Sequence, residues 1–195
     1  PGDPARYGHE RYFATRPGLG ILRKRLGNVQ LAGVEYGEPL TFGRARVTFH
    51  PAGHVLGSAQ IRIEADGCTW VVSGDYKRDP DPTCAPFEVV RCDTFISEAT
   101  FALPVYRWAP TECVIEEIWD WWQSNRRAGA TSVLGCYALG KAQRVLAELR
   151  RHTNEIVYVH GAVQALTDVY REAGIDMVPT QPVTNERRDY AGELI

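Results

Sequence analysis

A chain of 195 residues with 44% apolar and 24% charged residues is long enough to bury a core and has an ordinary globular composition. Its formal charge of −2 excludes an overall basic field, so any nucleic-acid partner has to be argued from local sites. The five cysteines, an odd number without a C-x-x-C pair, favour reduced thiols in a cytoplasmic protein over disulfides or a zinc knuckle. With no run of about 18 apolar residues and no signal-peptide pattern, we expect neither a membrane span nor secretion.

The first half of the chain is predicted to contain one short helix followed by short strands. A threonine, an early proline and a closing glycine bound the helix over 15–27. Asp66-Gly67 is typical of the two-residue turn of a β-hairpin. Alternating apolar residues predict strands within 29–37, 40–50, 58–67, 68–75 and 93–100.

The second half of the chain is predicted to alternate helices with strands. Apolar residues at helical spacing, with acids at the start and Arg126-Arg127 at the end, predict a helix over 111–129. Its three tryptophans are interpreted as packing residues, with a base-stacking platform as the alternative. Further elements are expected in the order strand, helix, strand, helix, strand at 131–137, 140–151, 155–159, 162–174 and 175–179. This alternation predicts a parallel sheet with crossover helices and therefore an α/β fold.

The stretch FHPAGHVLGSAQ, residues 49–60, contains two histidines four residues apart. On a helix they would share one face, as zinc ligands do, but Pro51 and Gly53 disfavour a helix there. We therefore predict a strand that ends near His50, followed by a loop with His54 at its tip. A histidine on such a loop is a candidate metal ligand or catalyst, and the alternative is a histidine that hydrogen-bonds within the turn.

Two carboxylates follow predicted strands. Asp75 comes after an apolar strand and a glycine, and it is either a metal ligand or a turn residue that bonds its own backbone. Glu98, at the end of the apolar strand in ISEAT, is either catalytic or a cap for the following turn. His160 also follows a strand and is interpreted as structural.

The segment GCYALGKA, residues 135–142, has nearly the spacing of a phosphate-binding P-loop. Ala142 stands where that motif needs a hydroxyl for magnesium, and Tyr137 and Leu139 are bulky, so an NTPase is disfavoured. Lys141, at the expected start of a helix, remains a candidate phosphate contact.

Four segments, in their order along the chain, resemble the metallo-β-lactamase-fold nucleases that carry a β-CASP insertion: PAGHVLGSA, SGDYKRDPDPT, ISEATFALPVYRW and GCYALGKAQRVL. Within them the chain most resembles the ligase-associated DNA damage response exonucleases, which are also labelled mRNA 3′-end processing factors. The resemblance extends from about Asp3 to the end. It implies an α/β fold in which part of a metallo-β-lactamase αββα sandwich, over 1–108, is followed by part of a β-CASP parallel α/β domain, over 109–195.

The resemblance also implies roles for individual residues. His54 matches a histidine ligand of one zinc ion, and Asp75 matches an aspartate whose carboxylate bridges two metal ions. Glu98 matches a catalytic acidic residue that orients a histidine further along the chain. Two zinc ions, or manganese, would activate a water and stabilise an in-line displacement at phosphorus.

The chain departs from the family in its second metal-binding motif, HxHxDH, which is represented only by DPARYGH at 3–9. Asp3 takes the place of the motif's aspartate, whereas Pro4 replaces its last histidine and cannot ligate a metal. Other family histidines would fall before residue 1 or beyond Ile195, so we expect the chain to be a piece of a longer exonuclease. With only His54, Asp75 and Asp3 as metal ligands, we expect it to hold zinc weakly and to be inactive by itself.

The implied activity is metal-dependent hydrolysis of single-stranded DNA in DNA repair, with a DNA ligase and a helicase as possible partners by family association. An RNA-processing β-CASP ribonuclease and a non-catalytic scaffold that has lost metal ligands are the alternatives, and a small-molecule hydrolase is disfavoured by the β-CASP-like half. Tyr106 and Trp108 are expected to pack in the core, with base stacking as the alternative. Contacts to nucleic-acid phosphates are expected from Lys77, Arg78, Arg107 and Lys141.

Overall fold

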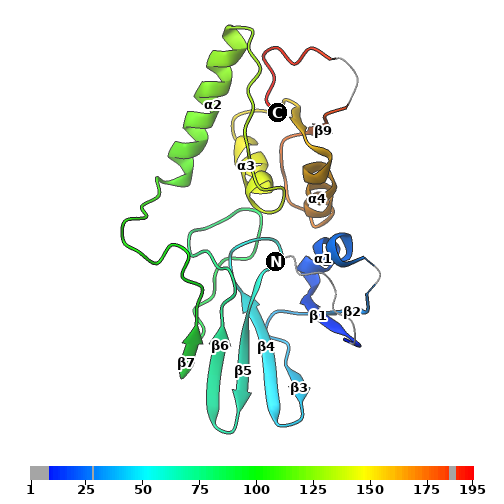
Figure 1. Cartoon of the computed structure of the whole chain (residues 1–195), viewed down its shortest axis with the longest axis vertical. Helices are drawn as coiled ribbons and strands as arrows, with labels where there is room; N and C mark the ends of the chain where they lie inside the picture. Colours follow the sequence, from blue (N-terminus) through cyan, green and yellow to red (C-terminus); the bar gives the residue numbers. More distant parts are fainter. Residues whose placement is uncertain (1–8, 28, 185–187) are drawn as a thin grey trace. The chain divides into compact units, whose positions relative to one another are not determined.

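The computed structural model of the chain describes residues 9–27, 29–184 and 188–195 (Figure 1). The predicted ligand Asp3 and the neighbouring Pro4 lie outside the described residues. The chain divides into two compact units, one up to Thr100 and one from Phe101 onward. Within the described residues, no helix has both the length and the apolar character needed to span a membrane.

The first unit begins with a small strand–helix–strand motif. Strand β1 (Tyr12–Thr15) leads through a 3₁₀ turn, η1 (Arg16–Gly18), into helix α1 (Leu19–Leu26), and strand β2 (Leu31–Val34) then pairs in parallel with β1. The predicted helix is confirmed, whereas β1 was not predicted. A run of four residues whose strand partner, in the described part of the chain, lies beyond the helix carries little local signal of its own.

A five-stranded sheet forms the larger part of the first unit. Its strands, in the spatial order β3-β4-β5-β6-β7, are β3 (Leu40–Phe42), β4 (Ala45–Pro51), β5 (Ala59–Ala65), β6 (Cys68–Val72) and β7 (Thr94–Ile96). Pairing is antiparallel from β3 to β6, and β7 joins β6 in parallel. Asp66 and Gly67 adopt φ angles of 52° and 79°, which confirms the predicted turn between β5 and β6.

The described residues of the second unit form three helices and a parallel strand pair. They are α2 (Thr111–Arg127), α3 (Lys141–Leu149), β8 (Val157–Val159), α4 (Gly161–Glu172) and β9 (Thr180–Pro182). Strands β8 and β9 pair in parallel across α4, as the alternation of elements predicted. The fold is therefore mixed α/β.

One predicted strand of the second unit is wrong and another is displaced. Within the described residues, 131–137 form an isolated parallel bridge, from Ser132 to Leu194, instead of a strand. Ser132 is fully buried there whereas Val133 is 69% exposed, so the run is not buried on both faces. The strand predicted near 175–179 begins later, as β9 at Thr180, and the buried Val178 donates its backbone N–H to the Leu146 carbonyl.

The aromatic residues of the second unit divide between core and surface. Trp122, on α2, is fully buried and its indole Nε1 donates to the Gly192 carbonyl at 3.0 Å, which confirms a packing role for that tryptophan. Trp121 is 39% exposed. Tyr106 and Trp108 are 45% and 69% exposed, so the expectation that they pack in the core is wrong.

Candidate metal centre

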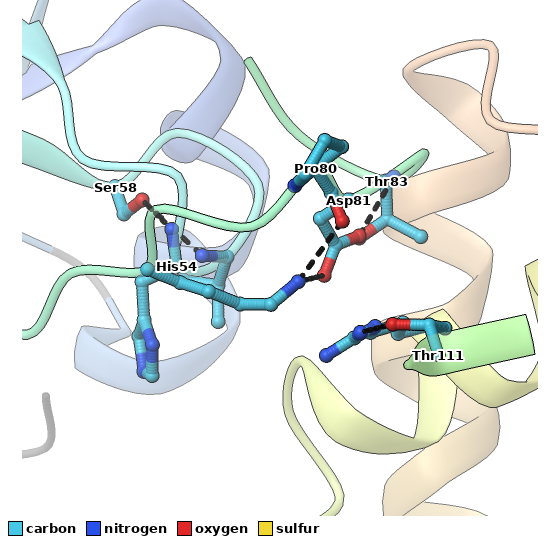
Figure 2. A network of polar contacts seen from close by, with 9 residues as sticks. His54, Ser58, Pro80, Asp81, Thr83 and Thr111 are labelled. Atoms are coloured by element: carbon cyan, nitrogen blue, oxygen red, sulfur yellow. Dashed lines mark hydrogen bonds and ion pairs between the residues drawn. The ribbon is translucent and has the colours of Figure 1, made fainter. Parts of the chain in front are cut away.

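The loop that carries His54 leaves β4 after Pro51 and is closed by a serine. The hydroxyl of Ser58 accepts hydrogen bonds from the backbone N–H of His54 at 3.0 Å and of Val55 at 3.2 Å (Figure 2). The Ser58 carbonyl accepts from the N–H of Ala52 at 3.2 Å, so both ends of the loop are joined. His54 therefore lies in a turn rather than on a helix, as predicted. The role of Ser58 was not predicted, although a hydroxyl four residues after the histidine is typical of a side chain that closes a turn.

Gly53 allows this loop to lie directly against the segment after β6. Its φ is 70°, and a Cβ at that position would lie 2.3 Å from the Lys77 carbonyl oxygen and 2.9 Å from the Phe87 nitrogen. Only glycine adopts such a backbone and fits such a gap without displacing its neighbours. The close approach brings the histidine loop next to the chain that carries Asp75.

The segment that carries Asp75 is held at both ends by backbone hydrogen bonds. The N–H of the fully buried Ser73 donates to the Ile96 carbonyl at 2.9 Å, which ties this end of the segment to β7. The N–H of Lys77 donates to the Ala52 carbonyl at 3.0 Å. Asp75 thus lies between Ser73, which bonds the sheet, and Lys77, which bonds the histidine loop.

His54 Nε2 lies 3.7 Å from Asp75 Oδ2. Two donor atoms at about 2.1 Å from one tetrahedral ion would lie about 3.4 Å apart, so this pair fits neighbouring positions around a metal with little movement. The two side chains are 40% and 51% exposed, which leaves them open to an ion from solvent. Imidazole nitrogen and carboxylate oxygen are both ligands that zinc accepts.

The pair provides two donors rather than a complete coordination sphere. Among the residues that the structure describes, no three side chains of the His, Cys, Asp or Glu type gather closely enough to hold a metal ion. Asp3, the third predicted ligand, belongs to the part of the chain outside that description.

The other histidines of the sequence analysis have structural contacts. His50 Nε2 lies 3.0 Å from Thr48 Oγ1, and its Nδ1 lies 3.1 Å from Glu88 Oε1. His160 precedes α4 and its Nδ1 accepts from the N–H of Ala162 at 3.1 Å, which is a helix cap. Both ring nitrogens of His50 thus lie within hydrogen-bond distance of a protein atom, whereas the 3.7 Å between His54 Nε2 and Asp75 Oδ2 exceeds that distance.

Glu98 closes a turn two residues after β7 ends. Its Oε2 accepts a hydrogen bond from the N–H of Thr100 at 2.8 Å, the capping arrangement that was the alternative to a catalytic role. This contact engages one carboxylate oxygen and leaves the proposed catalytic role as a prediction.

The four predicted phosphate contacts occupy different environments. Lys77 Nζ donates to the Pro80 carbonyl at 3.1 Å and lies 3.4 Å from Asp81 Oδ2, whose side chain is 4% exposed (Figure 2). Asp81 also accepts from the Thr83 N–H and hydroxyl at 2.9 and 2.6 Å. The Lys77 ammonium is thereby part of a loop-internal network. Arg78, Arg107 and Lys141 are exposed.

The P-loop-like segment uses its amides internally. The N–H of Gly140 donates to Gln143 Oε1 at 2.7 Å, and the next two amides donate to Leu139 and Tyr137 carbonyls at 3.1 and 3.3 Å. These three backbone amides are therefore not free to surround a phosphate, which agrees with the prediction that the segment is not the P-loop of an NTPase. Burial raises the pKa of the nearby Cys136 thiol, which makes it a poor nucleophile.

Comparison with known proteins reveals nuclease relatives, although no family model matches the chain. It is 28% identical, over 88% of its residues, to a probable DNA ligase of Opitutus terrae. It is 32% identical, over 60% of its residues, to the endoribonuclease YSH1 of Gibberella zeae, and 28% identical, over 63%, to an RNase J-like protein of Methanocaldococcus jannaschii. The chain spans only 17%, 14% and 31% of these relatives' own lengths, respectively.

Proposed function

We propose that this chain, a homologue of the metallo-β-lactamase/β-CASP nucleases, contributes His54 and Asp75 to a metal centre that hydrolyses phosphodiester bonds of nucleic acid. The observation that carries the proposal is the 3.7 Å separation of His54 Nε2 and Asp75 Oδ2 on two loops that backbone hydrogen bonds hold together. The homology supports the class of reaction, and the two side chains identify where in this chain it would take place.

The proposed metals are two zinc ions, with manganese as the substitute, in a centre that further ligands complete. When bound, such ions activate a water and stabilise charge on the phosphorus oxygens. His54 would offer the lone pair of Nε2 to one ion, and Asp75 would place its carboxylate between the two. The hydrogen bonds of Ser58 limit reorientation of the histidine loop, so little ordering is needed when an ion binds. Glu98 is proposed to orient a partner histidine rather than to touch metal.

Single-stranded DNA is the proposed substrate, degraded from an end. The match to a protein named as a probable DNA ligase extends over 88% of this chain, which supports a role in DNA repair beside a ligase activity. RNA is the second candidate substrate, because two other relatives are named as an endoribonuclease and an RNase J-like protein. The two substrates share the same metal chemistry at the phosphate.

Metal content and cleavage test the proposal together. The 195-residue chain, and a version with any flanking coding sequence restored, would be loaded with zinc and analysed by mass spectrometry. Each would then be mixed with end-labelled single-stranded DNA or RNA of one sequence, with zinc, manganese or a chelator. We expect cleavage only where two ions are bound, and its loss in His54→Ala and Asp75→Asn.

The matched control is His50→Ala, which removes a neighbouring histidine that contacts Thr48 and Glu88 instead. We expect this variant to retain metal and cleavage. Cleavage that persists at full rate in His54→Ala would contradict the assignment of the site. Metal-free and inactive protein in every form would favour a non-catalytic scaffold.

A further inference from the structure

Three exposed aromatic rings lie together in the segment FALPVYRW, residues 101–108, far in sequence from the metal pair. Phe101, Tyr106 and Trp108 are 55%, 45% and 69% exposed, and we call them the aromatic cluster. Leu103 and Val105 in the same segment are 64% and 74% exposed. A contiguous apolar surface of this kind on a folded protein marks a binding site more often than a packing accident.

The rings of the aromatic cluster hold one another in a defined arrangement. Phe101 stands nearly perpendicular to Tyr106 (78°, centroids 5.1 Å apart) and to Trp108 (89°, 5.3 Å). Tyr106 and Trp108 are tilted by only 15°, with centroids 6.3 Å apart. The backbone N–H of Tyr106 donates to the Leu103 carbonyl at 3.1 Å, which forms a turn directly before Tyr106 and Trp108. The cluster is thus preformed while its rings stay accessible.

We infer that the aromatic cluster stacks the bases of single-stranded nucleic acid, an inference that rests on the proposed function. Every base has a π face, and aromatic side chains bind single strands by stacking on such faces without reading sequence. Because Tyr106 and Trp108 are nearly parallel, bases stacked on the two rings would also be nearly parallel, as successive bases of one strand are. The aromatic cluster would hold the bases of the nucleic-acid strand, and the phosphates of that strand would lie outside the stacked bases.

The charge around the aromatic cluster favours an anionic partner, such as nucleic acid, over a basic or neutral one. Arg107 is exposed between Tyr106 and Trp108, and the segment 101–108 contains no acidic residue. An exposed arginine next in sequence to two stacking residues is available to a phosphate of the same strand that the rings bind.

Binding without cleavage tests this inference. The 195-residue chain, in chelator so that no metal contributes, would be titrated into a fluorescein-labelled oligothymidylate and followed by anisotropy. We expect Trp108→Ala to weaken binding about tenfold, the loss of one base stack, and Trp108→Phe to recover most of the affinity. Trp121→Ala is the matched control, since it removes another exposed tryptophan from the same unit and should bind as the unchanged chain does.

An oligonucleotide of the same length with abasic sugars in place of bases separates stacking from phosphate contacts. The unchanged chain should lose affinity for it, and Trp108→Ala should show little further loss. An equal effect of Trp108→Ala on both oligonucleotides, or no effect on either, would overturn the inference. So would an absence of binding by the unchanged chain, or a change of oligomeric state in the variant that shows the cluster to be a contact between protein copies.

The outcomes keep this inference distinct from the proposed nuclease activity. Loss of binding in Trp108→Ala, together with an absence of cleavage by both the 195-residue chain and the extended version under all metal conditions, would support the stacking site and contradict the nuclease. Metal-dependent cleavage together with unchanged binding in Trp108→Ala would support the nuclease and contradict the stacking site. Circular dichroism of each variant confirms that a change in affinity does not reflect unfolding.

Discussion

His54 Nε2 and Asp75 Oδ2 lie 3.7 Å apart although their residues follow different strands of the first unit. The N–H of Lys77 donates to the Ala52 carbonyl, so a backbone bond lies two residues from each member of the pair. Backbone hydrogen bonds therefore hold the two loops in place, while both side chains remain partly exposed and able to bind a ligand. Changes to the side chains and changes to the loops should therefore have different effects.

Removal of either donor should lower metal affinity without unfolding the protein. For His54→Ala or Asp75→Asn, we expect zinc affinity to fall by more than about 100-fold, since even residues that only support metal ligands are worth that much. Without metal, the free energy of unfolding should change by less than about 0.5 kcal/mol, as for other partly exposed side chains. Calorimetric zinc titration and urea denaturation measure the two quantities.

The neighbouring histidine should behave in the opposite way. His50→Ala removes contacts to Thr48 and Glu88, which should cost about 1–2 kcal/mol of stability and leave zinc affinity unchanged. A fall in zinc affinity equal to that of His54→Ala would show that His50, rather than His54, is the ligand.

Gly53→Ala should disrupt the histidine loop. The added Cβ would lie 2.3 Å from the Lys77 carbonyl oxygen in a backbone with φ of 70°, so we expect a loss of about 3 kcal/mol or more, together with weaker zinc binding. Gly43→Ala is the control, because Gly43 has φ of 59° and nothing within 4 Å of the added atom. Its cost should be only about 1–2 kcal/mol, and equal costs measured in urea would refute the role of close packing at Gly53.

Lys77 and Arg78 should differ although both were predicted to contact phosphates. Lys77→Gln breaks an ion pair with the nearly buried Asp81 and should cost about 2 kcal/mol of stability. Arg78 is exposed, so Arg78→Gln should leave stability unchanged and reduce the salt slope of oligonucleotide binding by about one. Anisotropy titrations at several salt concentrations measure this slope. A slope that falls in Lys77→Gln but not in Arg78→Gln would show that Lys77, rather than Arg78, contacts a phosphate.

Acid should weaken the second unit through Glu155. A bidentate hydrogen bond from the Arg126 guanidinium holds the pKa of the Glu155 carboxyl below its ordinary value, and Glu155 correspondingly raises the pKa of Arg126. Because the folded-state pKa is the lower one, the stabilisation is complete above the ordinary glutamate pKa and is lost as pH falls through the folded-state value.

The magnitude of that effect should be modest. Both side chains are partly exposed, at 31% and 47%, so the pair should contribute no more than about 1 kcal/mol after solvent screening. Glu155→Gln should lower stability at neutral pH by that amount and flatten the fall in stability below about pH 4.5. A variant whose pH profile coincides with that of the unchanged chain would show that the pair contributes nothing.

Local patterns predicted the four described α-helices and the hairpin turn correctly, and were wrong where strands depend on distant partners. The helix at 111–127 follows from apolar spacing and end charges, and the Asp66-Gly67 turn follows from two residues that accept positive φ. Residues 131–137 have the apolar character of a strand, but in the described part of the chain they form a single bridge, between Ser132 and the distant Leu194. No pattern within those seven residues carries that information.

By itself the sequence determined the strand-to-loop transition at His54, the position of Asp75 after a strand, and the helices and hairpin turn, because each depends on neighbours along the chain. Only the tertiary structure decided that the His54 and Asp75 side chains meet, that Lys77 is engaged by Asp81, and that Tyr106 and Trp108 face solvent. These outcomes depend on which segments distant in sequence approach one another, as Gly53 approaches the Lys77 carbonyl. Residue type thus identifies candidate chemistry, and packing selects which candidates share a site.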